Sequence, residues 1–269
     1  MVEYRDQLQR TIRLAQTPKR IISLVPSQTE LLYDLGLENE VMGITKFCVH
    51  PSHFRSTKNI VGGTKQVKLD KIIALAPDII LCNKEENTKE MVAELETIAP
   101  VHVSDIANID DCIEMIQQYG TLFDRRTEAS NIVQKIAFDL DDFQKFIKTR
   151  PIKKVAYFIW RKPWMVVGKD TFINYLLELN HFENVYKHKG RYPEIDLENL
   201  RSEGGGPEVV FLSSEPYPFK EDHAFEIARY VQNGKTVFVD GELFSWYGSR
   251  LTKSFEYFKD LHQRLKDNS

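Results

Sequence analysis

Cysteine is scarce in this sequence of 269 residues, which contains only Cys48, Cys82 and Cys112. Their number is odd and their spacing matches no zinc finger, so we expect neither a disulfide framework nor a structural zinc site. The low count does not indicate whether the protein works in an oxidising or a reducing compartment.

Long apolar segments are absent as well. No run of about 18 apolar residues occurs, so we expect no membrane-spanning helix. The opening segment, MVEYRDQLQRTIRLAQTPKR, has no apolar core of the kind that a secretory signal needs. We therefore expect a periplasmic or membrane-associated extracellular protein if a signal peptide was removed, and a cytoplasmic protein if the chain is native as given.

Charge of one sign is not in excess, because 36 Lys and Arg residues stand against 39 Asp and Glu residues and the net charge is −3. This balance gives no reason to expect nucleic acid or an anionic membrane as a partner. Catalytic and nucleotide motifs are missing too: the sequence has no GxSxG, no HExxH, no phosphate-cradling glycine loop and no dinucleotide fingerprint. We expect a binding protein without an intrinsic cofactor rather than an enzyme.

The sequence does contain two successive α/β patterns. Apolar runs that predict strands alternate with amphipathic segments that predict helices, which indicates a mainly parallel sheet in each half. The strands are predicted at 20–25, 41–45, 78–82, 101–104, 154–159, 209–212 and 237–240, and the helices at 28–35, 67–75, 87–98, 109–119 and 171–179. Candidate caps are Ser27 and Thr29 for the first helix and Asp170 and Thr171 for the last.

The two halves share a local repeat. The segment APDIILCNKEE (76–86) aligns without a gap with GPEVVFLSSEP (206–216), so that Glu85 matches Glu215. Two prolines follow the second acid at alternate positions, and because proline stops both strand and helix they hold this acid on a stiff turn. We interpret the match as an internal duplication.

A long helix is predicted between the halves. Apolar side chains recur at three- and four-residue steps, a spacing that predicts one helix over 127–149 with Thr127 as its cap. We therefore expect an N-terminal α/β lobe (1–123), a connecting helix (124–150) and a C-terminal α/β lobe (151–269). A stiff helix between two lobes limits how far a cleft between them can open.

Large aromatic residues follow the ends of several predicted strands. In open parallel sheets, ligands bind beyond the carboxyl ends of the strands. These positions therefore predict an apolar surface for a bulky, flat ligand, with burial in the core as the alternative. The residues are Phe47, Trp160, Trp164, Tyr217, Trp246 and Tyr247.

Polar residues in the same loops are candidates for the polar edge of a ligand. Ser27 lies at the start of the helix that follows the first strand, where plain helix capping is the alternative. Gly63 and Thr64 lie in a later turn. His50, in the loop after the second strand, is a candidate contact for a metal in the ligand; a surface or hydrogen-bonded role stays open, and His53 lies nearby.

At this point the sequence resembles a known family. The segments RIISLVPSQTELLYDLGL, VGGTK, LAPDIIL, WMVVGKDTFINYLLEL, LSSEPYPF and DGELFSWYGSRL, in this order, resemble the cobalamin- and siderophore-type substrate-binding proteins of ABC importers, and the cobalamin-binding branch most. The resemblance implies two α/β lobes joined by one long backbone helix. It also implies that a corrinoid, or a related metal chelate such as an iron chelate, is held between the lobes against the aromatic residues and delivered to a membrane permease.

The resemblance further implies one surface glutamate per lobe that pairs with arginines of the permease. Glu215 matches the acid of the C-terminal lobe, and the repeat assigns Glu85 to the N-terminal lobe, with Glu86 as the alternative. Acids on rigid turns suit this role, because complementary charge mainly sets encounter rate and register. Some cobalamin receptors carry a tyrosine where this sequence has His50, so the contact on the ligand's axial face stays open.

Other functions remain compatible with the sequence. A siderophore or haem receptor is the nearest alternative, and a cytosolic corrinoid or tetrapyrrole carrier is another. A chelatase-like enzyme would need cluster-binding cysteines or paired histidines, which the sequence does not clearly supply. For the receptor we expect a monomer.

Overall fold

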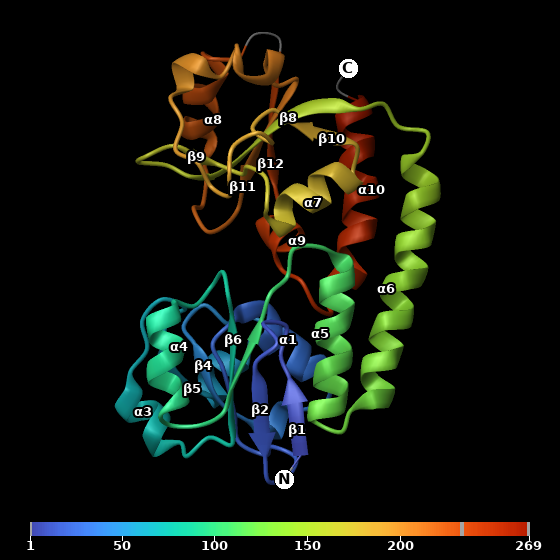
Figure 1. Cartoon of the computed structure of the whole chain (residues 1–269). Coiled ribbons are helices and arrows are strands. Elements are labelled where there is room, and N and C mark those ends of the chain that lie inside the picture. Colours follow the sequence, from blue (N-terminus) through green and yellow to red (C-terminus); the bar gives the residue numbers. More distant parts are fainter. Residues whose placement is uncertain (1, 232–233, 268–269) are drawn as a thin grey trace. The chain divides into compact units, whose positions relative to one another are not determined.

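The computed structural model describes residues 2–231 and 234–267 and consists of two compact units (Figure 1). Unit 1 runs from the start of the chain to Phe138 and also includes Tyr247–Thr252; unit 2 consists of Asp139–Trp246 and the segment from Lys253 onward. Tyr247–Thr252 thus packs in unit 1 although it lies far along the chain, in the range predicted for the C-terminal lobe.

Unit 1 is built on a parallel sheet with the strand order β5-β4-β3-β6-β7. The strands are β3 (Ile21–Ser23), β4 (Val41–Thr45), β5 (Asn59–Gly62), β6 (Ile79–Asn83) and β7 (Val101–Ser104). Every residue of β6 is buried, because helices cover both faces of the sheet and the strand is correspondingly apolar. Four of these strands were predicted; the edge strand β5 was not.

Helices lie on both faces of this sheet, with α3 and α4 on one side and α5 on the other (Figure 1). The helices of unit 1 are α1 (Pro26–Asp34), α2 (Phe54–Thr57), α3 (Leu69–Ala74), α4 (Lys89–Glu96) and α5 (Ile109–Leu122), with a 3-10 turn at Glu38–Glu40. The predicted caps of α1 are wrong: Val25 is the N-cap residue and Pro26 opens the helix, so Ser27 and Thr29 lie within its first turns.

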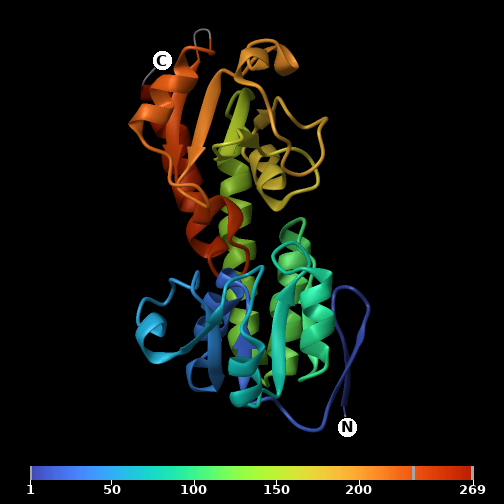
Figure 2. The same cartoon turned by 90° about the vertical axis from the view of Figure 1, so that its left-hand side faces the viewer.

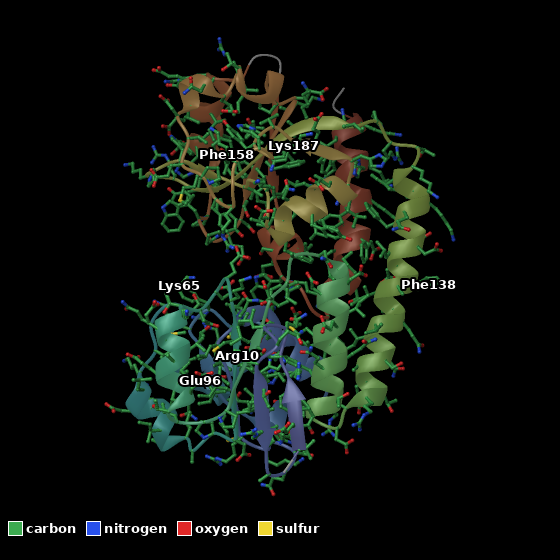
Figure 3. The ribbon with its side chains drawn as sticks, viewed as in Figure 1. Arg10, Lys65, Glu96, Phe138, Phe158 and Lys187 are labelled. Atoms are coloured by element: carbon green, nitrogen blue, oxygen red, sulfur yellow. The ribbon has the colours of Figure 1, made fainter. Side chains whose placement is uncertain are left out.

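A hairpin that the sequence did not predict, β1 (Val2–Arg5) with β2 (Thr11–Leu14), lies at one edge of unit 1 (Figure 2). Buried Asp6 in its turn accepts a hydrogen bond from the backbone N–H of Val103 in β7 at 3.1 Å. Arg10 bonds both Asp6 and Glu96, at 2.8 and 2.7 Å (Figure 3). These charges attach the hairpin to the edge of the sheet.

The long helix α6 (Arg126–Ile147) belongs to both units, because unit 1 ends at Phe138 within it. The prediction of one helix over 127–149 is confirmed apart from its ends. Thr127 is not its cap, since the helix already includes Arg126. The predicted apolar spacing buries Phe143, whereas Phe138 points away from the packed face and is 74% exposed (Figure 3).

Unit 2 contains a second parallel sheet with the order β10-β8-β11-β12, and a short strand β9 pairs antiparallel with β8. The strands are β8 (Lys153–Trp160), β9 (Met165–Val166), β10 (Phe182–Asn184), β11 (Val209–Ser213) and β12 (Lys235–Val239). The helices are α7 (Phe172–Leu179), α8 (Glu221–Ala228), α9 (Gly241–Ser245) and α10 (Leu251–Asp267), with 3-10 turns at Leu197–Asn199 and Glu203–Gly205. Of the predicted caps of α7, Thr171 is the N-cap residue and accepts from the N–H of Asn174.

Four strands of one sheet correspond to four of the other, β4-β3-β6-β7 to β10-β8-β11-β12. Ile21 of β3 lies opposite Ile79 of β6, and Val155 of β8 lies opposite Val209 of β11. The repeat in the sequence therefore places β6 on β11 and β3 on β8. The predicted fold, two similar α/β lobes with mainly parallel sheets and one long helix contributing to both, is confirmed.

No helix within residues 2–231 and 234–267 combines the length and the apolar character that crossing a membrane requires. Cys48, Cys82 and Cys112 are buried and unbridged.

Candidate functional site

Four aromatic side chains at the carboxyl end of the unit 2 sheet form what we call the aromatic surface: Trp160, Trp164, Tyr217 and Phe219. Trp160 ends β8, and Tyr217 follows β11; since these parallel strands are neighbours, their ends meet at the same edge. The Trp160 ring packs edge-to-face on Tyr217 at 5.6 Å, and Trp164 stacks on Phe219 at 6.2 Å.

The aromatic surface has a buried contact on Phe158 and an exposed member, Trp160. Buried Phe158, labelled in Figure 3, packs edge-to-face under Trp164 with ring centres 5.7 Å apart. Trp160 is 39% exposed, so part of its side chain is available to a ligand. The sequence predicted Trp160, Trp164 and Tyr217; it did not predict Phe219, although Pro218 between two aromatic residues marked the loop.

Polar groups border the aromatic surface. Arg161 lies over the Trp164 ring at 5.4 Å and donates two hydrogen bonds to one oxygen of Glu226, at 2.8 and 3.2 Å. This carboxylate raises the pKa of the guanidinium. His223 accepts the N–H of Lys220 at Nδ1, so in the neutral ring Nε2 carries the proton and lies 3.3 Å from the hydroxyl of Tyr217.

Glu215 is half-buried, and its carboxylate points at the turn around α9. Oε1 accepts hydrogen bonds from Nε1 of Trp246 at 2.8 Å and from the hydroxyl of Ser245 at 2.7 Å. Burial raises the pKa of the Glu215 carboxyl, and these two bonds lower it in part. Trp246 is only 6% exposed. This tryptophan, predicted as a ligand contact, is therefore held inside unit 2 by the acid predicted as a docking residue.

In unit 1, three residues of the predicted site gather at the carboxyl edge of the sheet. Phe47, 49% exposed, lies across the backbone of Gly63, where a β-carbon would meet the ring at 3.3 Å. The carbonyl of Thr64 accepts from the side chain of Asn87 at 2.8 Å. The ammonium of Lys46 lies 4.9 Å from the Phe47 ring centre. Unit 1 thus offers one exposed aromatic ring beside a cation.

Two other predicted ligand contacts, Ser27 and Tyr247, are buried in unit 1 at 5% and 7% exposure. The side-chain amide of Gln28 donates to Ser104 at 2.6 Å and to the hydroxyl of Tyr247 at 3.3 Å, and the hydroxyl of Tyr119 donates to its oxygen at 2.8 Å. Burial raises the pKa of Tyr247. In this arrangement, Ser27 and Tyr247 belong to a buried polar cluster.

The sequence did not predict the buried ion pair between Arg250 and Glu30. Arg250 donates to both oxygens of Glu30 in α1, at 2.7 and 3.0 Å, with both side chains nearly inaccessible. The backbone N–H of Gly248 donates to the thiol sulfur of Cys112 in α5 at 3.0 Å. These bonds attach the returning segment Tyr247–Thr252 to unit 1.

The remaining candidates lie in loops of unit 1. His50 is half-buried, and His53, its competitor in the sequence, bonds Glu38 at 2.8 Å. Glu85 and Glu86 are half-buried, and their backbone N–H groups donate to Oδ1 of Asn83 at 2.8 and 3.1 Å. The described residues include no group of three or more His, Cys, Asp or Glu side chains that could hold a metal ion.

Comparison with known proteins identifies the family of this chain. The model of a family described as periplasmic binding protein matches residues 21–240. An uncharacterized ABC transporter substrate-binding lipoprotein from Bacillus subtilis is 28% identical over 187 residues, which are 66% of this chain and 59% of that protein. The match thus spans less than two thirds of the length of this relative.

Two further proteins carry names that mention a ligand. A vitamin B12-binding protein from Vibrio campbellii is 24% identical over 199 residues, 72% of this chain and 70% of the relative. The solved structure of a periplasmic haem-binding protein from Pseudomonas aeruginosa aligns with a TM-score of 0.77 over 91% of this chain and 92% of its own, at 19% identity. At that identity the likeness concerns the fold alone.

Proposed function

Because the chain belongs to the periplasmic binding protein family, we propose that it is the substrate-binding receptor of an ABC importer and that it captures a corrinoid or a related metal chelate. The names of the Bacillus and Vibrio relatives support the importer and the corrinoid respectively. The proposal makes the protein a binding protein rather than an enzyme. It favours a periplasmic or membrane-associated extracellular location over the cytoplasmic one.

The aromatic surface of unit 2 carries this proposal. Corrins and porphyrins are broad, flat macrocycles, and a group of packed aromatic rings with one exposed tryptophan matches their apolar faces. Trp160 is the exposed ring; it packs on Tyr217, which in turn packs on Phe219. Phe47 of unit 1, with Lys46 beside it, is the second exposed aromatic group among the proposed contacts.

Titration of the purified protein with cobalamin, by calorimetry and absorption, tests the proposal. We expect Trp160→Ala to weaken binding by about 2 kcal/mol, as for an aromatic anchor. Phe138→Ala, at an exposed phenylalanine on α6, is the matched control and should leave affinity unchanged. No heat with either cobalamin or cobinamide would exclude the corrinoid.

Haem or a ferric siderophore is the second candidate ligand. The Tyr217–His223 pair beside Trp160 favours it, since a tyrosine oxygen can bind haem iron. The same titration with haem separates the two ligands. Haem binding with an absorption change that Tyr217→Phe removes, together with no response to cobalamin, would favour haem.

We also propose that Glu215 and either Glu85 or Glu86 dock the receptor on its permease. Glu215→Gln is the informative variant, because a glutamine oxygen can still accept from Trp246 and Ser245 while the charge is lost. The expected result is unchanged ligand affinity with impaired uptake, and uptake at the wild-type rate would exclude the role. Glu85→Gln and Glu86→Gln, measured separately, distinguish the two acids of unit 1. We further propose that the receptor is a monomer, which light scattering checks.

A further inference from the structure

A cavity of about 540 Å³ lies at the amino ends of the strands in unit 2, the sheet edge opposite to the aromatic surface. Lys153 at the start of β8 and Lys235 at the start of β12 line it, together with Arg201 and Glu208. Its apolar wall includes Val209 and Leu265. The volume is typical of a small-molecule site, and none of the proposed ligand contacts belongs to it.

The charges around this basic cavity are unbalanced. Three cationic side chains line it against the single carboxylate of Glu208, whose Oε2 already accepts the backbone N–H of Lys154 at 2.7 Å. Lys153 and Lys235 are half-buried residues, and their ammonium groups have no hydrogen bond or ion pair with any residue that the structure describes. A partly desolvated cation without a partner favours an incoming anion.

In unit 1, the lysine at the position equivalent to Lys153 is paired with an acid. Lys19, which corresponds to Lys153 by strand register, has its ammonium 3.5 Å from the carboxylate of Glu40. The residue that corresponds to Glu40 is Glu183, and it bonds Lys187 at 2.8 Å instead. The acid that would balance Lys153 is therefore committed elsewhere.

Two further observations concern the charges near Lys153. Glu203, in the loop that leads to the cavity, is paired with His188 at 2.9 Å and Lys189 at 3.1 Å. The pKa of His262 in α10 is lowered to about 4, first by burial and then by the positive charges of Arg150, His181 and Lys153. The surroundings of Lys153 thus disfavour an additional positive charge.

Arg201 and Gly206, which both line the cavity, are held in place by close contacts. Arg201 is held by a hydrogen bond from its Nη2 to the carbonyl of Arg229 at 2.7 Å. Gly206 has φ = +80°, and a β-carbon there would lie 2.7 Å from the carbonyl oxygen of Arg201. A side chain at this position would collide with the backbone of Arg201, so glycine permits the close approach of these two backbone segments.

We propose that the basic cavity binds an organic phosphate ester. The ester group would bond Lys153, Lys235 and Arg201, and the organic part would lie against Val209 and Leu265. Two oxygens of a phosphate dianion can bridge separate cations, and the volume exceeds what inorganic phosphate alone would fill.

Phenyl phosphate is the probe, because it joins a phosphate dianion to an apolar ring. We expect calorimetry to detect binding that the double variant Lys153→Gln/Lys235→Gln weakens at least about tenfold. Glu208→Gln should tighten binding several-fold, since it removes the carboxylate and keeps an acceptor for Lys154. Lys145→Gln, at an exposed lysine of α6 paired with Asp141, is the control for the loss of a lysine outside the cavity and should have no effect.

The outcomes separate this proposal from its rivals. No heat with phenyl phosphate at millimolar concentration, or equal weakening by Lys145→Gln, overturns it. Phenol and inorganic phosphate test whether both parts of the probe are needed. Co-sedimentation with phosphatidylglycerol vesicles, lost in the double variant, would identify a lipid headgroup rather than a soluble ester as the source. Cobalamin titration of the double variant should be normal, so failure here is distinguishable from failure of the receptor function.

Discussion

In both units, a carboxylate just before a central strand accepts backbone N–H groups from the chain that enters the neighbouring strand. Asp78, before β6, accepts from Lys19 at 2.8 Å and Arg20 at 3.0 Å. Glu208, before β11, accepts from Lys154 at 2.7 Å. Acids at matching positions thus fix matching strands, which is the structural form of the repeat seen in the sequence.

The carboxyl ends of the same two strands differ. In unit 1, the side chain of Asn83 holds the backbone of Glu85 and Glu86. In unit 2, the carboxylate of Glu215 itself is engaged, by Trp246 and a serine. The units are therefore alike where the sheet is assembled and different where a ligand or partner would act. The two acids that the repeat paired are not equivalent in their contacts.

The largest expected effect concerns the returning segment Tyr247–Thr252, which packs in unit 1. Arg250→Ala leaves the carboxylate of Glu30 buried without its guanidinium, which should lower the free energy of unfolding by about 3–5 kcal/mol. Urea denaturation measures it. The double variant Arg250→Met/Glu30→Leu should recover much of the loss, because the buried charge is gone. A loss below about 1 kcal/mol for Arg250→Ala would show that the segment contributes little to unit 1.

Sequence periodicity predicted most of the scaffold. Buried strands such as β6 and β11 are continuous apolar runs, and α6 repeats apolar residues at helical spacing, so local pattern and final structure agree. The hairpin at Val2–Leu14 was missed because its strands are short and largely exposed on one side.

Long-range pairing could not be predicted in the same way. Glu30 and Arg250 are far apart in the sequence, and nothing in either local pattern names its partner. Trp246 and Tyr247 follow a strand, as ligand contacts do, yet their polar atoms bond Glu215 and Gln28. Large aromatic residues in such loops serve equally as ligand platforms and as internal anchors, and only the tertiary structure distinguishes the two.

The second-largest effect concerns the pH dependence of stability and two buried histidines, His102 in unit 1 and His262 in unit 2. Burial lowers the pKa of both, and that of His262 falls from 6.5 to about 4. Between these values the unfolded chain binds a proton that the folded protein does not, so stability falls as the pH drops from about 6.5 to about 4. The contribution of His262 is roughly 3 kcal/mol.

His262→Phe checks this dependence. Phenylalanine retains the stacking on Phe182 at 4.7 Å and cannot take up a proton. The variant should lose less stability than the wild type over this pH range, measured by urea denaturation at each pH. An unchanged pH profile would contradict the assignment to His262.

The third prediction tests whether the matching carboxylates are energetically alike. Asp78 accepts from two backbone N–H groups and Glu208 from one. Asp78→Ala should cost about 2 kcal/mol and Glu208→Ala about 1 kcal/mol, because each hydrogen bond to a charged acceptor contributes and both sites are partly solvated. Equal costs measured by urea denaturation would mean that the second bond of Asp78 adds nothing.

The smallest effect is expected for Glu215→Gln, which should change stability at pH 7 by less than about 1 kcal/mol because the amide oxygen can still accept from Trp246 and Ser245.

The pKa of Glu215 is raised above its ordinary 4.5, so above that pH the folded protein keeps a proton that the unfolded chain has lost. Stability conferred by this site therefore falls as the pH rises, the opposite sign to His262. Relative to the wild type, Glu215→Gln should gain stability in urea denaturation as the pH rises above about 4.5. A difference from the wild type that stays constant with pH would contradict the raised pKa of Glu215.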